Sequence, residues 1–323
     1  MRVTVTGGTG TIGLAVVKML VRAGHDVRAV VRRPDDFQER CPDDRVEINV
    51  GDVQDRTMVA AALDGADAAI HCVAFPPKQY KLNWDTTRFI LESLRPGAQF
   101  VMPGDASVFG FTPPGDRVGP RHPKASPARR GVVRADLERA ILAEGGTVIH
   151  LPEVFGPAVI RGRLVSVFQR ALSGRSVWFP GDLDRAREFL YIEDAARALI
   201  APLGRQAAKG AEYTAPGFAT ITPRAFVSLA FKAAGHESRL RSLPIPWLRA
   251  ASLLTAERRA SRDLIYLEAR PLLFDGSRIR KELGWTPEVD YADAIRRTLK
   301  WLRSEEGEAA IQRDRRHDRA SGG

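Results

Sequence analysis

Short apolar runs alternate with stretches of helical periodicity along the first half of the chain. The apolar runs are rich in β-branched residues, bounded by turn residues and too short to be helices, which is typical of buried strands. Between them, apolar residues recur every three or four positions, as on one face of a helix. Strands that alternate with helices predict an α/β fold with a doubly wound parallel sheet. The predicted strands are 2–5, 26–31, 46–50, 68–73, 99–102 and 147–151, and the predicted helices are 14–23, 58–63, 83–94 and 129–143.

The rhythm changes beyond Pro152, where helical segments alternate with only short strands. We expect a first domain over residues 1–151 and a smaller second lobe over 152–303, with two or three strands returning to the main sheet. The polar, arginine-rich stretch 304–323 is predicted to be a disordered tail. The helices predicted in the second half are 164–172, 194–203, 224–234 and 292–302, with a strand at 210–214.

Composition narrows the class of protein and its partners. The chain has 323 residues, of which 44% are apolar and 27% charged, as expected for a soluble globular protein. The net charge of +10 comes from arginines scattered through the predicted helices, which argues against nucleic-acid binding. No apolar run approaches the roughly 18 residues of a membrane span, and Met1 leads directly into the first strand. We therefore expect a cytoplasmic protein that does not bind a membrane.

A glycine-rich loop joins the first predicted strand to the first predicted helix. Glycines allow a tight turn and close approach of a pyrophosphate, which the N–H groups at the start of the helix then bind. A glycine-rich turn in an ordinary α/β protein is the alternative, but strand, loop and helix occur in the required order. The predicted cofactor-binding residues of this loop are Gly7, Gly10, Thr11, Ile12 and Gly13.

Six further motifs follow the glycine loop in sequence. They are Gly51-Asp52-Val53, His71-Cys72-Val73-Ala74, the pair Asn83 and Thr87, Val154-Phe155-Gly156-Pro157, the segment from Arg187 to Asp194, and Leu283-Gly284-Trp285-Thr286-Pro287. With the TGxxGxxG loop, they resemble the extended short-chain dehydrogenase/reductase family, the NAD-dependent epimerase/dehydratases. The resemblance runs from Met1 to about Arg303 and implies a Rossmann domain followed by a substrate-binding lobe.

The resemblance also implies where the cofactor and substrate lie. Asp52 and Val53 would meet the adenine, and Val73 and Ala74 would pass the nicotinamide. His71 by itself is more typical of a histidine packed within a strand. The two cysteines predict no disulfide framework, and no cluster of side chains has metal-ligand spacing.

The residues after the second predicted strand favour NADP over NAD. An acidic residue there would accept hydrogen bonds from the ribose 2′-hydroxyl of NAD. This chain has Arg32 and Arg33 instead, and its acids Asp35 and Asp36 come only after Pro34. Two guanidinium groups suit a 2′-phosphate in charge and geometry. Two solvated arginines in an arginine-rich chain are the alternative.

The catalytic helix departs from the family pattern. The resemblance implies a Tyr four residues before a Lys, so that both lie on one helix face. Aligning Glu138 with the acid that follows the family's Lys puts Arg130 at the Tyr position and Arg134 at the Lys position. A shift of two residues would put Ala128 and Val132 there instead. In either register the tyrosine is missing.

The end of the fifth predicted strand has changed as well. Asp105 stands at the usual Ser or Thr position, and Ser107 follows two residues later. An arginine keeps its proton near neutral pH, so Arg130 could hold an anion or an oxyanion but could not exchange a proton. Asp105 could act as an acid or base, or could pair with Arg130. The predicted catalytic group is Asp105, Ser107, Arg130 and Arg134.

The predicted substrate contacts are Tyr80, Glu153 and Arg187. Glu153 replaces the Asn that the resemblance implies, which argues against the usual phosphate contacts of sugar nucleotides. Two functions stay open. One is an NADP-binding oxidoreductase, epimerase or redox-neutral enzyme acting on a small carbonyl, hydroxyl or anionic metabolite, and the other is a non-catalytic protein that responds to NADP. The long second lobe favours the enzyme, and the lost Tyr and Lys favour the alternative. A homodimer is compatible with either function.

Overall fold

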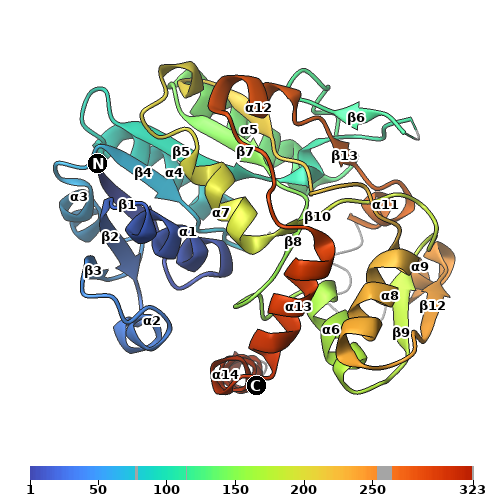
Figure 1. Cartoon of the computed structure of the whole chain (residues 1–323). Coiled ribbons are helices and arrows are strands. Elements are labelled where there is room, and N and C mark those ends of the chain that lie inside the picture. The colour runs from blue at the N-terminus through green and yellow to red at the C-terminus, as the bar shows by residue number, and fades with distance from the viewer. Residues whose placement is uncertain (77–78, 114, 253–263, 322–323) are drawn as a thin grey trace. The chain divides into compact units, whose positions relative to one another are not determined.

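The computed structural model of the chain describes residues 1–76, 79–113, 115–252 and 264–321, and it divides the chain into two compact units (Figure 1). Unit 1 consists of Met1–Leu151, Glu193–Ala215 and Phe274–Thr286, and unit 2 of Pro152–Ile192, Pro216–Leu273 and Pro287–Gly323. Among the described residues, no helix combines the length and apolar composition needed to cross a membrane.

A seven-stranded parallel sheet forms the centre of unit 1, in the order β11-β7-β5-β4-β1-β2-β3. The strand order reverses between β1 and β4, and ligands of open α/β sheets bind beyond the carboxyl ends of the strands at such a point. The predicted doubly wound α/β fold is therefore confirmed. The strands are β1 (Arg2–Thr6), β2 (Asp26–Val31), β3 (Val46–Val50), β4 (Ala68–His71), β5 (Gln99–Gly104), β7 (Thr147–His150) and β11 (Glu212–Thr214).

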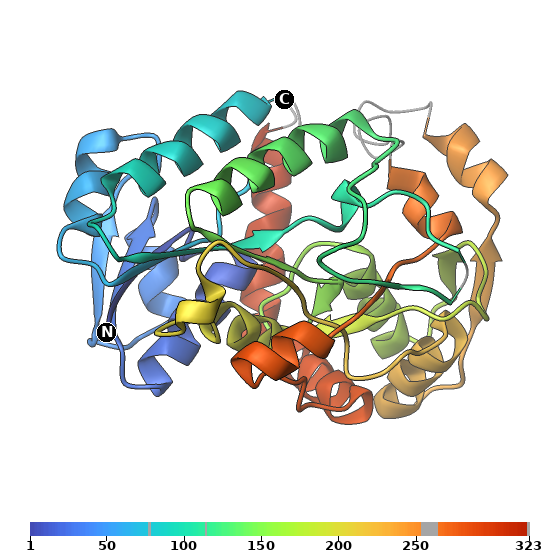
Figure 2. The ribbon, with the colours of Figure 1, turned by 90° about the horizontal axis from the view of Figure 1, so that it is seen from above.

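Helices cover both faces of this sheet, so its central strands are buried on both sides. Helices α3, α4 and α5 lie on one face and α1 and α7 on the other (Figure 2). Val3, Val5, Ile70 and Val101 have no exposed surface, which is why these strands read as continuous apolar runs. The helices are α1 (Thr11–Arg22), α2 (Pro34–Arg40), α3 (Arg56–Leu63), α4 (Tyr80–Ser93), α5 (Arg129–Ala143), α7 (Ile192–Ile200) and α12 (Ser277–Leu283), with short elements at β6 (Arg117–Val118), η2 (Ala106–Val108) and η3 (Gln206–Ala208).

Unit 2 packs its helices around a core of aromatic side chains. Phe226 lies 5.2 Å from Phe155, 4.5 Å from Phe189 and 5.8 Å from Tyr291, measured between ring centroids. Such ring pairs contribute more than their buried area alone. The helices are α6 (Arg163–Leu172), α8 (Pro223–Ala234), α9 (Ile245–Ala251), α11 (Ile265–Ala269), α13 (Tyr291–Leu302) and α14 (Glu305–Ser321). The strands are β8 (Glu153–Phe155), β9 (Val177–Pro180), β10 (Phe189–Tyr191) and β12 (Leu240–Leu243). Strand β13 (Leu273–Phe274) lies where the chain passes from unit 2 back to unit 1.

The structure differs from two predictions for the second half. Within the described residues, one strand returns to the main sheet, β11, where two or three were expected. Of the other short strands, β8 pairs with β10, β9 with β12, and β13 with β6 of the first half. The predicted disordered tail contains helix α14 instead. Its first turn carries Glu305, Glu306 and Glu308, which suit the positive end of the helix dipole, and the small residues Gly307 and Ala310 are buried.

Candidate active site

The glycine loop is folded tightly between β1 and α1. Gly7 has a φ of +78°, and a Cβ on Gly13 would lie 2.1 Å from the carbonyl oxygen of Gly7. No side chain caps the first turn of α1, whose N-cap is Gly10, and no acidic residue lies in that turn. The N–H groups of Thr11 and Ile12 thus begin a helix with a positive dipole end, which fits a pyrophosphate. The geometry suits the cofactor role predicted for these residues.

The two arginines after β2 each contact a carboxylate. Arg33 Nε lies 2.9 Å from Asp36 Oδ2, and Arg32 Nη1 lies 3.9 Å from Asp52 Oδ2. Asp52 also accepts a hydrogen bond from the Gln54 N–H at 2.9 Å, and Val53 is buried beside it. Both guanidinium groups are largely exposed, with 76% of the Arg32 side chain and 53% of the Arg33 side chain accessible.

His71 ends β4 as a buried, neutral side chain. Its Nδ1 lies 2.6 Å from Thr6 Oγ1 on the neighbouring strand β1. Burial, helped by the charge of Arg134, lowers the pKa of His71 to about 3. This matches the alternative of a histidine packed within a strand. The residues that follow reach the surface, and Ala74 lines the cavity described next.

A cavity of about 310 Å³ opens in unit 1 among the β4–α4 loop, α4, the end of β5, and α5. Asn83 holds the wall on the β4 side, because its side-chain amide accepts from the Phe75 N–H at 2.9 Å and donates to the Phe75 carbonyl at 3.2 Å. Besides Ala74, four of the predicted site residues line the cavity together with aromatic side chains. They are Tyr80, Asp105, Arg130 and Arg134, with Phe75 and Trp84.

Asp105 and Arg130 form an ion pair at this cavity. Arg130 Nη2 lies 2.9 Å from Asp105 Oδ2, and Asp105 Oδ1 accepts a hydrogen bond from the Ser107 N–H at 2.9 Å. Burial raises the pKa of Asp105, but the Arg130 charge, the Ser107 hydrogen bond and the Arg134 charge outweigh it and leave the pKa below its usual value. Ser107 itself is buried and is not among the residues that line the cavity.

A buried carboxylate, Glu138, holds the neighbouring groups in place. Its Oε1 accepts hydrogen bonds from the Asp105 N–H at 3.1 Å and from Arg134 Nε at 3.2 Å, and its Oε2 accepts one from Lys124 Nζ at 2.9 Å. Arg134 Nη2 also donates to the Pro103 carbonyl at 2.6 Å. Because Glu138 has no exposed side-chain surface, these contacts fix Arg134 at the carboxyl end of β5.

The network around Glu138 extends to the edge of the sheet. Lys124 Nζ also lies 3.1 Å from Glu212 Oε2 on β11, and His150 Nε2 lies 2.8 Å from Glu212 Oε1. Lys124, His150 and Glu212 were not predicted from the sequence. No motif marks them, since they come from a polar loop and two separate strands and meet only when β11 pairs with β7.

The predicted contacts Glu153 and Arg187 belong to unit 2, whereas Tyr80, Asp105 and Arg130 belong to unit 1. Arg187 is buried and pairs with Glu268, with Arg187 Nη1 lying 3.1 Å from Glu268 Oε2. Glu153 pairs with Arg163 at the start of α6. Neither Arg163 nor Glu268 was predicted from the sequence.

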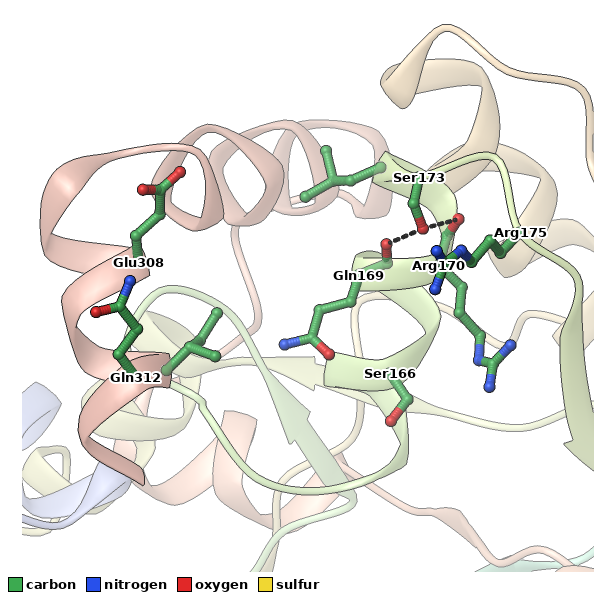
Figure 3. A pocket seen from close by; sticks show the side chains of 9 residues that line it. Ser166, Gln169, Arg170, Ser173, Arg175, Glu308 and Gln312 are labelled. Carbon is green, nitrogen blue, oxygen red and sulfur yellow. Dashed lines mark hydrogen bonds between the residues drawn. The ribbon is translucent and has the colours of Figure 1, made fainter. Parts of the chain in front are cut away.

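Unit 2 has a cavity of its own, of about 510 Å³, between α6 and α14 (Figure 3). Glu308 and Gln312 on α14 face Gln169 on α6 across it. The side chains of Ser173 and Arg170 make hydrogen bonds to backbone carbonyls of α6 and the loop after it. None of the family-like motifs of the sequence lies on this cavity, so unit 1 carries the stronger candidate site.

A family model supports the assignment that the glycine loop and the sheet suggest. The model of the NAD-dependent epimerase/dehydratase family matches residues 3–214. The chain belongs to this family. A second model, of GDP-mannose 4,6 dehydratase, matches residues 156–298. The protein is thus a member of an NAD(P)-dependent family of oxidoreductases and epimerases, with an extended short-chain dehydrogenase/reductase fold.

Proteins similar to the chain carry different names. A dTDP-glucose 4,6-dehydratase of Streptomyces griseus is 26% identical over 92% of this chain and 92% of its own length. A 3-diazoavenalumate denitrifying reductase of a Streptomyces species is 28% identical over 64% of this chain and 73% of its own. In structure, the chain is similar to a dTDP-glucose 4,6-dehydratase of Bacillus anthracis in complex with NAD, with a TM-score of 0.80 and 16% identity over 97% of this chain and 99% of the other.

Proposed function

We propose that the protein is an enzyme whose active site is the 310 Å³ cavity of unit 1 and whose substrate is a small carbonyl, hydroxyl or anionic metabolite. The observation that carries this proposal is that the Asp105–Arg130 pair lines this cavity instead of filling it. A pair that closed the site would favour the alternative, a non-catalytic protein that responds to NADP. The differing names of the relatives leave the substrate open within that class.

The side chains at the cavity suit roles other than the proton exchange of a tyrosine. Arg130 stays protonated near neutral pH, so it would hold an anionic substrate group or a developing oxyanion. Asp105, which is ionised at that pH, would accept or return a proton. Arg134, fixed by the Pro103 carbonyl and Glu138, would hold the nicotinamide ribose. The cofactor, when bound, would supply hydride transfer.

We further propose that NADP is preferred over NAD. Arg32 and Arg33 follow β2 and are largely exposed, so both can reach a 2′-phosphate. The similar structure from Bacillus anthracis holds NAD, so the preference is a property expected of this chain and not of its family.

Titrations of NADPH and NADH test the cofactor proposal. We expect NADPH to bind more tightly, and the Arg32→Ala/Arg33→Ala variant to lose about 1.5–3 kcal/mol of that affinity for each lost charge-assisted contact. Gly10→Val serves as the non-binding control, because its side chain would block approach to the loop. Equal affinities for both cofactors in the unaltered protein would contradict the preference.

A crystal structure with NADP bound tests the active-site proposal. We expect the nicotinamide C4 to face the cavity, with Asp105 and Arg130 within reach of a substrate atom placed there. A nicotinamide buried without an open space beside it would instead support the non-catalytic alternative.

A further inference from the structure

Two arginines and two glutamates of unit 2 form a closed group of ion pairs, here called the Arg–Glu cluster (Glu153, Arg163, Arg187 and Glu268). Arg163 contacts both carboxylates through its two terminal nitrogens. Arg187 Nη1 lies 3.1 Å from Glu268 Oε2, and its Nη2 donates to the Glu268 carbonyl at 2.9 Å. The four residues come from β8, α6, the loop before β10, and α11, so the tertiary fold alone brings them together.

The two guanidinium groups are built as an anion site would be. Both lie against the ring of Phe179, with Arg163 Cζ at 4.7 Å and Arg187 Cζ at 5.3 Å from its centroid. Only 6% of the Arg187 side chain is exposed. Among the described residues, neither Nε atom has a hydrogen-bond partner. Paired guanidinium groups with buried donors are suited to phosphate.

The two glutamates cancel this capacity. Two arginines and two carboxylates leave the Arg–Glu cluster without net charge. A phosphate entering the cluster would be repelled by the carboxylates of Glu153 and Glu268 at close range. Alternatively, it would have to displace these carboxylates from the arginines, which would leave partly buried charges without their partners. Both carboxylates are partly buried and paired with Arg163, with 30% of the Glu153 side chain and 23% of the Glu268 side chain exposed.

We infer that Glu153 and Glu268 determine specificity by closing the Arg–Glu cluster to phosphate and diphosphate groups, so that the substrate carries neither. The inference rests on the proposed function, because it takes unit 2 to be the substrate-binding lobe of the enzyme. It sets this chain apart from enzymes named for nucleotide sugars, such as the similar dTDP-glucose 4,6-dehydratases. The substrate class that remains is a small metabolite whose anionic group, if it has one, is a carboxylate or an enolate held by Arg130.

Calorimetric titration of the full chain with inorganic pyrophosphate, UDP and dTDP tests the inference. NADPH is present at saturating concentration, so that the dinucleotide site is filled. We expect the unaltered protein to bind none of the three probes at millimolar concentration. The Glu153→Gln variant gives the cluster a net charge of +1 and should bind pyrophosphate at least tenfold more tightly. Adding Arg187→Gln to that variant should remove the gain.

Asp293→Asn provides a matched control. Asp293 on α13 also bridges two arginines, Arg296 and Arg297, and 29% of its side chain is exposed. Its loss changes the charge of unit 2 equally without touching the Arg–Glu cluster, so pyrophosphate affinity should stay within threefold of the unaltered protein. If Glu153→Gln is too unstable to titrate, its melting temperature is measured instead, and pyrophosphate should raise it.

Two results would overturn the inference. One is micromolar binding of UDP or dTDP to the unaltered protein that is lost on Arg187→Gln, and the other is a Glu153→Gln variant that folds and gains no affinity. Failure of the proposed function would show differently, as a lack of NADPH binding or of an open space at the nicotinamide.

Discussion

Arginines meet carboxylates in both units of the protein, at the candidate site of unit 1 and in the Arg–Glu cluster of unit 2, but they are used differently. In unit 1, Arg130 pairs with Asp105, and 37% of its side chain remains exposed at a cavity. In unit 2, Arg187 is surrounded by the Phe179 ring, a backbone carbonyl and Glu268, and only 6% of its side chain is exposed. An arginine within a family-like motif is therefore available to a ligand only if its contacts within the protein leave part of its guanidinium group exposed.

The difference lies in what supports each arginine. Glu138 accepts hydrogen bonds from Arg134 and from the Asp105 N–H. The groups at the cavity are therefore oriented by a carboxylate that does not line the cavity itself. In unit 2 the carboxylates Glu153 and Glu268 are themselves part of the Arg–Glu cluster, in which Glu268 pairs with both arginines and Glu153 with Arg163. If this comparison holds, removing the support in unit 1 should harm the fold, and removing the partners in unit 2 should open a site.

The largest effect is expected for Glu138→Ala. It would leave Arg134 and Lys124 as buried cations without this shared partner, which should cost about 3–5 kcal/mol in the free energy of unfolding. Chemical denaturation measures the loss. Glu92→Ala is the control, since Glu92 pairs with Arg88 on the exposed face of α4 and should contribute no more than about 0.5 kcal/mol. Similar losses in both variants would mean that Glu138 is not a buried support.

A smaller effect is expected for Arg130→Ala, which sharpens the comparison at the cavity itself. Loss of a contact to a developing oxyanion should lower kcat by about 10²-fold, while the affinity for NADPH changes little. Arg134→Ala should weaken NADPH binding instead. Arg129→Ala, at the exposed neighbouring position, controls for charge, and steady-state kinetics with a substrate from a ligand screen gives the measurement. An Arg130→Ala enzyme with unaltered kcat would remove Arg130 from the mechanism.

The smallest effect concerns pH. Because the pKa of Asp105 lies below its usual value in the folded protein, its ionised form stabilises the fold above the pKa of the unfolded chain. This contribution is lost as the pH falls through the lower, folded pKa. Asp105→Asn should therefore cost up to about 1 kcal/mol at pH 7, and less in acid below the usual aspartate range. Unfolding at several pH values checks this, and a cost that does not shrink in acid would contradict it.

Most of unit 1 could be predicted from the sequence because its strands and helices follow simple periodicities. The bounds of β2, β3 and α5 agree with the prediction, since β2 and β3 are rich in β-branched residues and Pro34, Gly51 and Gly145 stand at or near the ends of the three elements. Helix α2 was not predicted, because seven mostly charged residues bury only Phe37. Its signal, Pro34 followed by two acids in the first turn, is a helix start too short to show periodicity.

The candidate site could be predicted only in part. The juxtaposition of Asp105 and Arg130 followed from their places at a strand end and on a helix face. The partners of Arg187 did not, because Glu268 lies 81 residues further along the chain. Ion pairs between distant segments produce no periodic pattern in a sequence. The charge of Arg187 could therefore be predicted, but the carboxylate that neutralises it could not.

The place of β11 in the sheet means that unit 1 cannot be made from its first 151 residues. Without β11, strand β7 would lose its hydrogen-bonded neighbour, and His150 and Lys124 would lose their contacts with Glu212. An unpaired strand edge is prone to pair with other chains. A ribosome that has released only those residues therefore holds an incomplete sheet, and the chaperones of the cell would meet the protein in this state until the strand that closes it emerges.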